Sequence, residues 1–129
     1  MLKFNSSPGP GGSFDDFGHI FISGPLALDS LTNTVYIISS EAMRLSSDEF
    51  ETLHLLAARE DVPLSFEVIY NAVWEQCDGM DRRNEARQGI ESVMMIINSA
   101  GNNFVWIEYN PPYGYVFRTR WGHNRDKWQ

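Results

Sequence analysis

The most informative stretch of the chain is residues 83–119, which read RNEARQGIESVMMIINSAGNNFVWIEYNPPYGYVFRT. In its first half, apolar residues recur at spacings of four, three and four. At 100° per residue these positions form one buried stripe of a helix, made of Ala86, Ile90, Val93 and Ile97. Gly101 is expected to close that helix in a left-handed conformation. Two strand-like segments follow, 104–109 and 115–119, and the five residues between them are too many for a two-residue turn. The stretch predicts a long helix and then a β-hairpin.

Two shorter helices are predicted upstream. Ser46 and Glu49 have the spacing of a capping box, which predicts a helix from Ser46 to about Arg59. Its buried positions are expected to be Phe50, Leu53, Leu56 and Ala57. Ser65 is a second candidate N-cap, for a helix that ends near Glu75. The positions expected to point inward on this helix are Val68, Ile69, Ala72, Val73 and Trp74.

The segment before these helices predicts a small antiparallel sheet. Short apolar or β-branched segments alternate with turn residues there, at 20–22, 26–28 and 34–38. A sheet, three helices and a hairpin make an α+β fold in the order of a winged helix-turn-helix. Residues 1–18 are rich in proline and glycine and are expected to be a flexible tail or linker, 19–121 the winged-helix domain, and 122–129 a C-terminal tail.

Charge is distributed unevenly along the chain. The 129 residues carry a net charge of −7, which by itself argues against nucleic-acid binding because phosphate binding needs a positive field. Residues 1–81 hold three cations and thirteen carboxylates, a net charge of −10, whereas residues 82–120 hold five cations and three carboxylates, a net charge of +2. The third helix and the hairpin therefore lie in the cationic part of the chain.

Three motifs in register carry a resemblance to a known family. Residues 45–53 read LSSDEFETL, residues 65–74 read SFEVIYNAVW and residues 114–117 read GYVF. From about residue 26 to 117 the chain resembles the C-terminal effector domain of OmpR/PhoB-type transcriptional regulators. In that family the corresponding motifs are LTxxEFxLL, SxxxLxxxVW and GYxF. The resemblance implies a four-stranded N-terminal sheet, three helices and a C-terminal wing.

The resemblance also implies a function. In that family the third helix enters the major groove, the wing reaches the neighbouring minor groove, and domains pair in tandem. The chain is therefore expected to be a DNA-binding transcriptional regulator domain. The candidate contacts to double-stranded DNA are Arg82, Arg83, Asn84, Arg87, Gln88, Glu91, Ser92, Met95, Arg118 and Arg120. The candidate wing tip is Tyr109, Asn110 and Tyr113.

The chain departs from the family where relatives keep cations. In members of the family the third helix contains the motif IxxLRxKL, whereas residues 90–97 of this chain read IESVMMII. In the wing, a carboxylate and a proline stand where those members have two arginines. The remaining arginines are either phosphate contacts or ordinary solvated charges. An alternative function is a degenerate winged-helix module with little DNA affinity that binds proteins through Met95, the wing tip and the acidic face of the first helix.

Two positions on the third helix have open interpretations. Gly89 lies in mid-helix, where glycine costs about 1 kcal/mol relative to alanine, so it marks either the close approach of another backbone or a tolerated defect. Met95 is expected to make an external contact, and Ile96 is expected to pack under the wing. The acidic loop 75–81 is expected to be a solvated turn, although in some relatives the equivalent loop touches RNA polymerase.

Catalytic, metal and membrane signatures are not found in the sequence. No glycine-rich loop precedes a helix, Cys77 has no cysteine partner, and His19, His54 and His123 lack metal-ligand spacing. Neither enzyme activity nor a cofactor is expected. No apolar run approaches the length of a membrane helix. The first residues lack the apolar stretch of a secretory signal and a single cysteine cannot form an internal disulfide, so a cytoplasmic protein is expected. Its expected partners are DNA, a second copy of the domain, and RNA polymerase or another protein. The short tail has no room for a receiver domain, so, if the sequence is complete, phosphorylation by a sensor kinase is not expected to be its switch.

Overall fold

The computed structural model describes residues 13–14, 19–101 and 103–120. An N-terminal sheet comes first, then three helices, then a hairpin. Most of the segment expected to be an N-terminal tail, and all of the expected C-terminal one, lie outside the described residues. The elements are β1 (Ser13–Phe14), β2 (Ile20–Ser23), β3 (Leu26–Asp29), β4 (Thr34–Ile37), β5 (Met43–Arg44), α1 (Ser47–Ala58), α2 (Phe66–Ile69), η1 (Tyr70–Trp74), α3 (Arg83–Ala100), β6 (Val105–Asn110) and β7 (Gly114–Thr119).

The N-terminal sheet has five antiparallel strands in sequence order. Phe21, Leu28 and Val35 are cross-strand partners on its buried face, because alternate residues of each strand point to the same side. β2, β3 and β4 confirm the three predicted strands. β1 and β5 were not predicted, because a strand of two residues is too short to leave a hydrophobic alternation in the sequence.

α1 confirms its prediction in detail. The Ser46 hydroxyl accepts the Glu49 N–H at 3.2 Å, and the Glu49 carboxylate accepts the Ser46 N–H at 3.2 Å, so both halves of the capping box form. The predicted stripe is buried against the sheet and the other helices, through Phe50, Leu53, Leu56 and Ala57.

The second helix differs from its prediction. It is capped by Ser65 as expected, but four α-helical residues pass into the π-helix η1, where the Glu75 N–H donates to the Tyr70 carbonyl five residues earlier. The predicted inward positions Val68 and Ala72 are wrong, because both are exposed. Ile69 and Trp74 are buried as predicted and Val73 is half-buried, whereas the buried Tyr70 was not predicted. Aromatic rings remove far more apolar surface from water than valine and alanine do, which favours the face that carries Tyr70 and Trp74.

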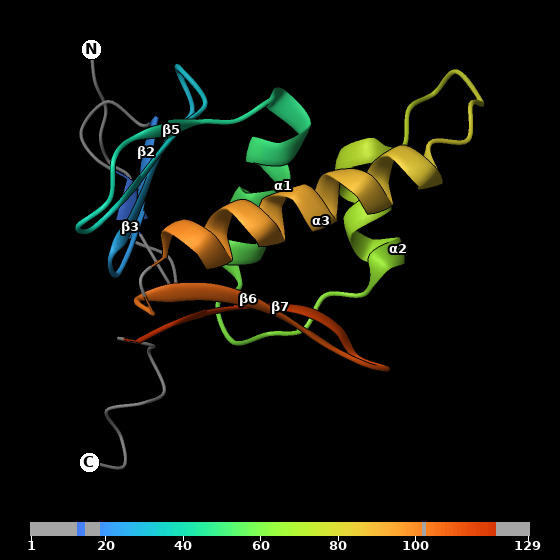
Figure 1. Ribbon diagram of the computed structural model, residues 1–129. Helices are drawn as coiled ribbons and strands as arrows, with labels where there is room; N and C mark the ends of the chain where they lie inside the picture. The colour runs from blue at the N-terminus through green and yellow to red at the C-terminus, as the bar shows by residue number, and fades with distance from the viewer. Residues whose placement is uncertain (1–12, 15–18, 102, 121–129) are drawn as a thin grey trace.

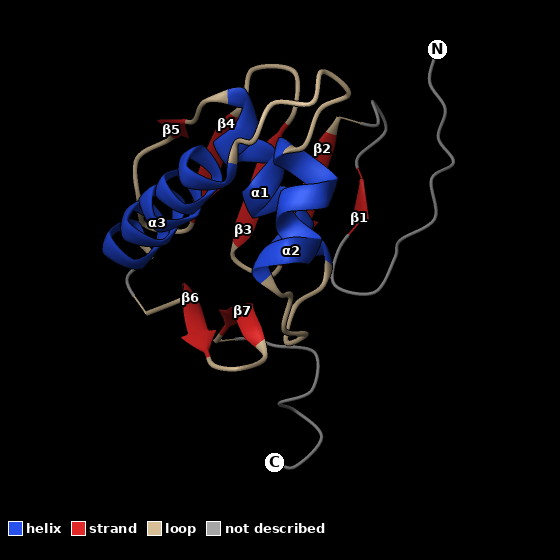
Figure 2. Ribbon diagram, turned by 90° about the vertical axis from the view of Figure 1, so that its right-hand side faces the viewer, coloured by secondary structure: helices blue, strands red, loops and turns tan. Residues whose placement is uncertain are grey.

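α3 crosses the front of the domain, with the hairpin running below it and the sheet beside its C-terminal end (Figure 1). α1 and α2 lie on its inner side (Figure 2), where the predicted stripe Ala86, Ile90, Val93 and Ile97 is fully buried. The core therefore sits between the sheet, α1 and the inner face of α3, and the outer face of α3 is left uncovered.

The predicted left-handed cap at Gly101 is wrong. Gly101 has a φ of −73°, and the left-handed residue is Asn103, with a φ of 64°. Glycine is required at position 101 for a different reason, because a Cβ there would lie 2.1 Å from the Val105 carbonyl oxygen. The chain turns this tightly so that β6 can pack directly against α3.

The hairpin is attached to the helices at two points. The Asn98 side chain on α3 donates to the Ile107 carbonyl at 3.1 Å and accepts the Ile107 N–H at 2.8 Å. On the other strand, Leu64 and Tyr115 exchange two backbone hydrogen bonds of 2.8 Å. These contacts fix the wing relative to α3.

In the described part of the chain, no helix is long and apolar enough to cross a membrane.

Candidate nucleic-acid interface

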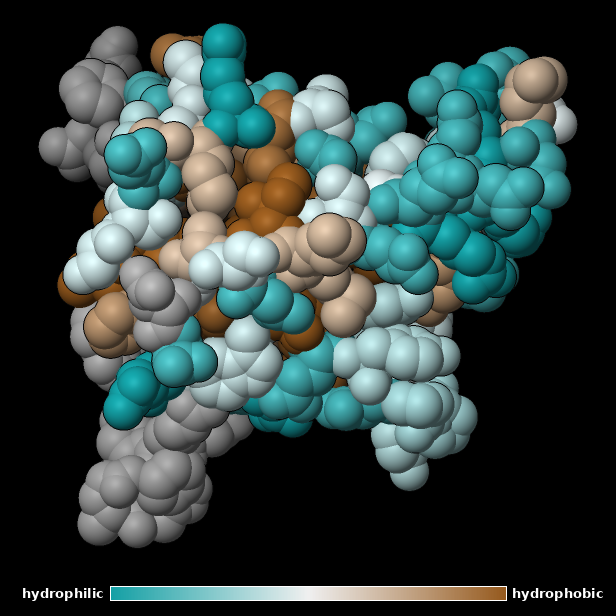
Figure 3. Space-filling view, in the orientation of Figure 1, coloured by the Kyte–Doolittle hydropathy of each residue, from teal (hydrophilic) through white to brown (hydrophobic). Residues whose placement is uncertain are grey.

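The outer face of α3 is a stripe of exposed side chains opposite the buried one. Asn84, Gln88, Glu91 and Met95 recur at spacings of four, three and four and are all exposed, while Ser92 at the edge of the stripe is half-buried. Hydrophilic surface gathers over the right-hand end of the molecule (Figure 3), where Figure 1 shows the loop before α3 and its first turns. The structure thus brings four of the predicted contact residues onto one open surface.

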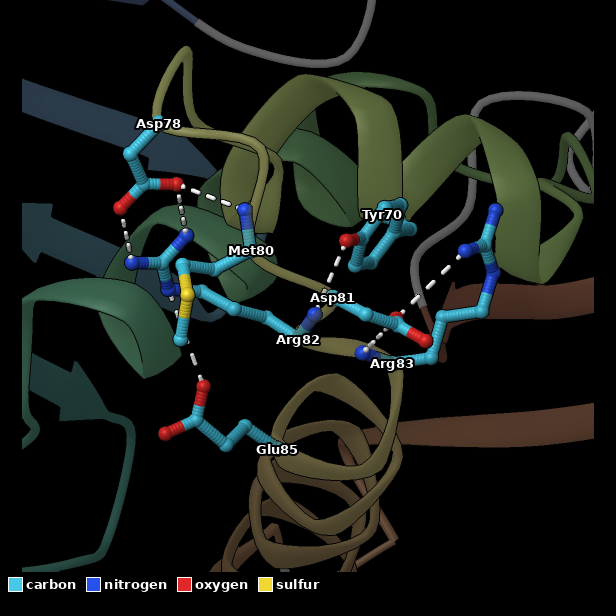
Figure 4. Close-up of polar contacts among 7 residues, drawn as sticks. All are labelled: Tyr70, Asp78, Met80, Asp81, Arg82, Arg83 and Glu85. Atoms are coloured by element: carbon cyan, nitrogen blue, oxygen red, sulfur yellow. Dashed lines mark hydrogen bonds and ion pairs between the residues drawn. The ribbon is translucent and has the colours of Figure 1, made fainter.

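Arg82, at the start of α3, is held by carboxylates. Its guanidinium makes two hydrogen bonds to Asp78, of 3.0 and 2.7 Å, and lies 3.8 Å from the Glu85 carboxylate (Figure 4). Asp78 also accepts the Met80 N–H at 3.0 Å. The Arg82 guanidinium, followed by the Met80 N–H, lowers the pKa of Asp78 to about 2, so this carboxylate is ionised at neutral pH.

Arg83 is paired in the same way. Its guanidinium lies 3.3 Å from Glu67 on α2 and 3.5 Å from Asp81, and its carbon stands 4.7 Å from the centre of the Tyr70 ring. Asp81 also accepts the Arg83 N–H at 3.1 Å, while the Tyr70 hydroxyl accepts the Arg82 N–H at 3.0 Å. Two backbone N–H groups at the start of α3, those of Arg82 and Arg83, are therefore already bonded to side chains of the protein (Figure 4).

We call this group the arginine–carboxylate cluster. Its two guanidinium groups face four carboxylates, so its net charge is −2. This composition opposes the attraction of DNA phosphates that the sequence alone suggested for this end of α3. The members of the cluster are Glu67, Asp78, Asp81, Arg82, Arg83 and Glu85.

Arg87 has a different environment. Its guanidinium carbon stands 4.1 Å above the centre of the Phe66 ring, and Phe66 stacks on Tyr70 with ring centres 5.9 Å apart. The side chain is exposed, and no carboxylate among the described residues forms an ion pair with it. Arg87 is thus a cation presented to solvent on an aromatic support, beside the outer stripe of α3.

Arg118 fastens the wing instead of facing outward. It lies 2.9 Å from Asp61 and 3.4 Å from Glu108. Glu108 in turn accepts the Trp106 indole N–H at 2.8 Å, and this bond above all lowers the pKa of Glu108. Arg120 is exposed at the end of β7, where its backbone N–H donates to the Phe104 carbonyl.

The tip of the wing is aromatic and exposed. Tyr109 and Tyr113 are 54% and 69% exposed, and Asn110 donates to Glu108 at 3.2 Å. The Tyr109 ring also packs against the Tyr115 ring in a tilted arrangement, with ring centres 4.8 Å apart. Burial, with a smaller effect of Tyr109, raises the pKa of Tyr115. The tip protrudes at the lower right of Figure 1, below the N-terminal half of α3.

The partners of the arginines were not predicted from the sequence. Glu67, Phe66 and Tyr70 all come from the preceding helix, and nothing local in the sequence pairs them with α3. One local signal was available, since Asp78 and Arg82 have the i,i+4 spacing of an ion pair. Across the residues described, no group of three His, Cys, Asp or Glu side chains is arranged to hold a metal ion.

Comparison with known proteins gives structural matches alone. No family model matches the sequence, and no curated protein is matched. The DNA-binding domain of Escherichia coli CadC superposes with a TM-score of 0.60 at 15% identity, over 85% of this chain and 92% of that one. The DNA-binding domain of Escherichia coli CpxR gives a TM-score of 0.54 at 16% identity, over 78% of this chain and 96% of that one.

A longer protein shares the same fold. The Thermotoga maritima response regulator DrrB, an OmpR/PhoB homologue, superposes with a TM-score of 0.60 at 23% identity, over 78% of this chain. The chain spans 45% of the length of DrrB. The architecture inferred from the three motifs is thereby confirmed: the chain has the winged-helix fold of OmpR/PhoB-type DNA-binding domains.

Proposed function

We propose that the chain is the DNA-binding domain of a cytoplasmic transcription regulator and that it places the outer face of α3 in the major groove. The observation that carries this proposal is the uncovered stripe of hydrogen-bonding side chains on an 18-residue helix beside a wing. The major groove of B-DNA admits one α-helix and displays a distinct pattern of donors and acceptors for each base pair. The fold shared with two solved DNA-binding domains and with a response regulator homologous to OmpR/PhoB supports the same function.

The roles of the contact residues follow from their chemistry. Gln88 is suited to pair with adenine N6 and N7, and Glu91 can accept from cytosine N4. Asn84 and Ser92 can bond to base edges or phosphates, and Met95 can contact a thymine methyl group. Among the candidate contact residues, all of which the structure describes, Arg87 and Arg120 are the exposed arginines without a carboxylate ion pair, so we expect few phosphate contacts from them and a shallow dependence of affinity on salt.

Replacing Arg87 by alanine tests the proposal. We expect about tenfold weaker binding to duplex DNA, and a salt slope smaller by about 0.9, because one phosphate contact and its released counterion are lost. Fluorescence anisotropy at about 50 mM and about 200 mM salt measures both quantities. Arg59→Ala is the matched control, because it removes an equal charge from the exposed C-terminal end of α1. Equal losses in the two variants would contradict a role for Arg87 in the interface.

A second candidate function is a protein-interaction module with little DNA affinity. It is favoured by the pairing of Arg82 and Arg83 with carboxylates, and by the exposure of large apolar or aromatic side chains nearby. Met95 is 71% exposed, in addition to the exposed tyrosines of the wing tip. The same titration separates the two functions, since no binding to random or genomic DNA at about 50 mM salt would favour the second.

A further inference from the structure

The arginine–carboxylate cluster lies at the end of α3 that a groove-binding helix brings near phosphates. Its ion pairs are on the surface, and pairs of this kind contribute little to the stability of a fold. Their effect on an approaching polyanion is larger, because the four carboxylates outnumber the two guanidinium groups. The cluster therefore matters more for binding than for folding.

The arginine–carboxylate cluster is held in place by further contacts besides its ion pairs. The Met80 N–H holds the Asp78 carboxylate against Arg82, in a turn closed by a 3.0 Å hydrogen bond. Tyr70 is 3% exposed and serves both arginines, accepting the Arg82 N–H through its hydroxyl and lying under the Arg83 guanidinium. Figure 4 shows the two arginines turned to opposite sides of this ring, each toward its own carboxylates.

We propose that Glu67, Asp78 and Asp81 are specificity-determining residues, which keep Arg82 and Arg83 from DNA phosphates and so suppress binding to DNA of arbitrary sequence. Phosphate contacts supply most of the non-specific affinity of DNA-binding proteins and carry no sequence information. Cancelling them leaves the base contacts of α3 to decide where the domain binds. Specificity is a difference between two affinities, and it rises when the unwanted one is reduced. This inference rests on the proposed function.

The test is the double variant E67Q/D78N. Both changes keep hydrogen-bond acceptors in place, so the turn at Met80 is retained while two negative charges are removed. The probes are a random-sequence duplex and a duplex enriched by the wild-type protein from a randomised pool. The matched control is E41Q/E51Q, which removes the same charge from exposed positions before β5 and on α1. Circular dichroism confirms folding, and D78N alone serves if the double variant is unfolded.

We expect E67Q/D78N to bind the random duplex about tenfold more tightly than the wild type at about 50 mM salt, with a salt slope steeper by about 0.9 for each arginine that gains a phosphate. The affinity for the enriched duplex should rise less, so the ratio between the two falls. An unchanged affinity for the random duplex, or a rise matched by E41Q/E51Q, would overturn the inference while the proposed function stands.

The remaining outcomes separate the two proposals further. If the wild type enriches no sequence from the pool and neither it nor the control binds the random duplex, but E67Q/D78N does bind that duplex, the masking role of the carboxylates is supported and the proposed function of the wild-type chain fails. If none of the three proteins binds DNA, both proposals fail, because the released arginines then have no phosphates to contact.

Discussion

Replacing Gly114 by alanine is expected to destabilise the domain by about 3–5 kcal/mol. Gly114 has a φ of +127°, where side chains other than glycine are strained. A Cβ there would also lie 2.2 Å from the Leu64 carbonyl oxygen, which accepts a hydrogen bond from Tyr115. Alanine thus has to break the link between the wing and the segment before α2.

Urea unfolding followed by circular dichroism measures this loss. Tyr113→Ala is the control, because Tyr113 is the preceding residue of the same turn, is 69% exposed and should change stability by less than about 0.5 kcal/mol. A Gly114→Ala variant with the same denaturation midpoint as the wild type would show that the wing does not close on Leu64 as described.

Replacing Gly89 by alanine is expected to destabilise the domain by about 2 kcal/mol, although alanine is the better helix former by about 1 kcal/mol. A Cβ at position 89 would lie 2.4 Å from the Cη2 and Cζ2 atoms of Trp74. That ring is buried and cannot move freely, because its indole N–H donates to the Thr52 hydroxyl at 3.3 Å. Of the two interpretations of Gly89, a close approach is correct, but a side-chain ring makes it instead of a backbone.

A double-mutant cycle separates the clash from helix propensity. In a Trp74→Phe background the smaller ring leaves room, so Gly89→Ala should become neutral or stabilising. Ser99→Ala on the exposed face of α3 reports propensity alone and should stabilise slightly. A Gly89→Ala variant that is more stable than the wild type would contradict the packing of Trp74 against α3.

Much of the fold could be predicted from local patterns. The capping box of α1 and the buried stripe of α3 were correct, because a cap and a helical period are properties of residues within two or three turns of one another. The second helix was predicted only in part, with Ile69 and Trp74 correct and Val68 and Ala72 wrong, for the complementary reason. Its apolar positions fit more than one face, and the burial of Trp74 against Gly89 and Thr52 selects between them.

In the candidate site, too, local features could be predicted from the sequence and long-range contacts could not. Periodicity along α3 alone identifies its outward residues, Asn84, Gln88, Glu91 and Met95, because the opposite face is apolar. The charge state of the surface around them could not be obtained in this way. Arg118 pairs with Asp61 from 57 positions earlier, and Arg83 pairs with Glu67 from 16 positions earlier. Such partners meet only when packing brings distant segments together, so the neutralisation of the arginines is a property of the folded chain.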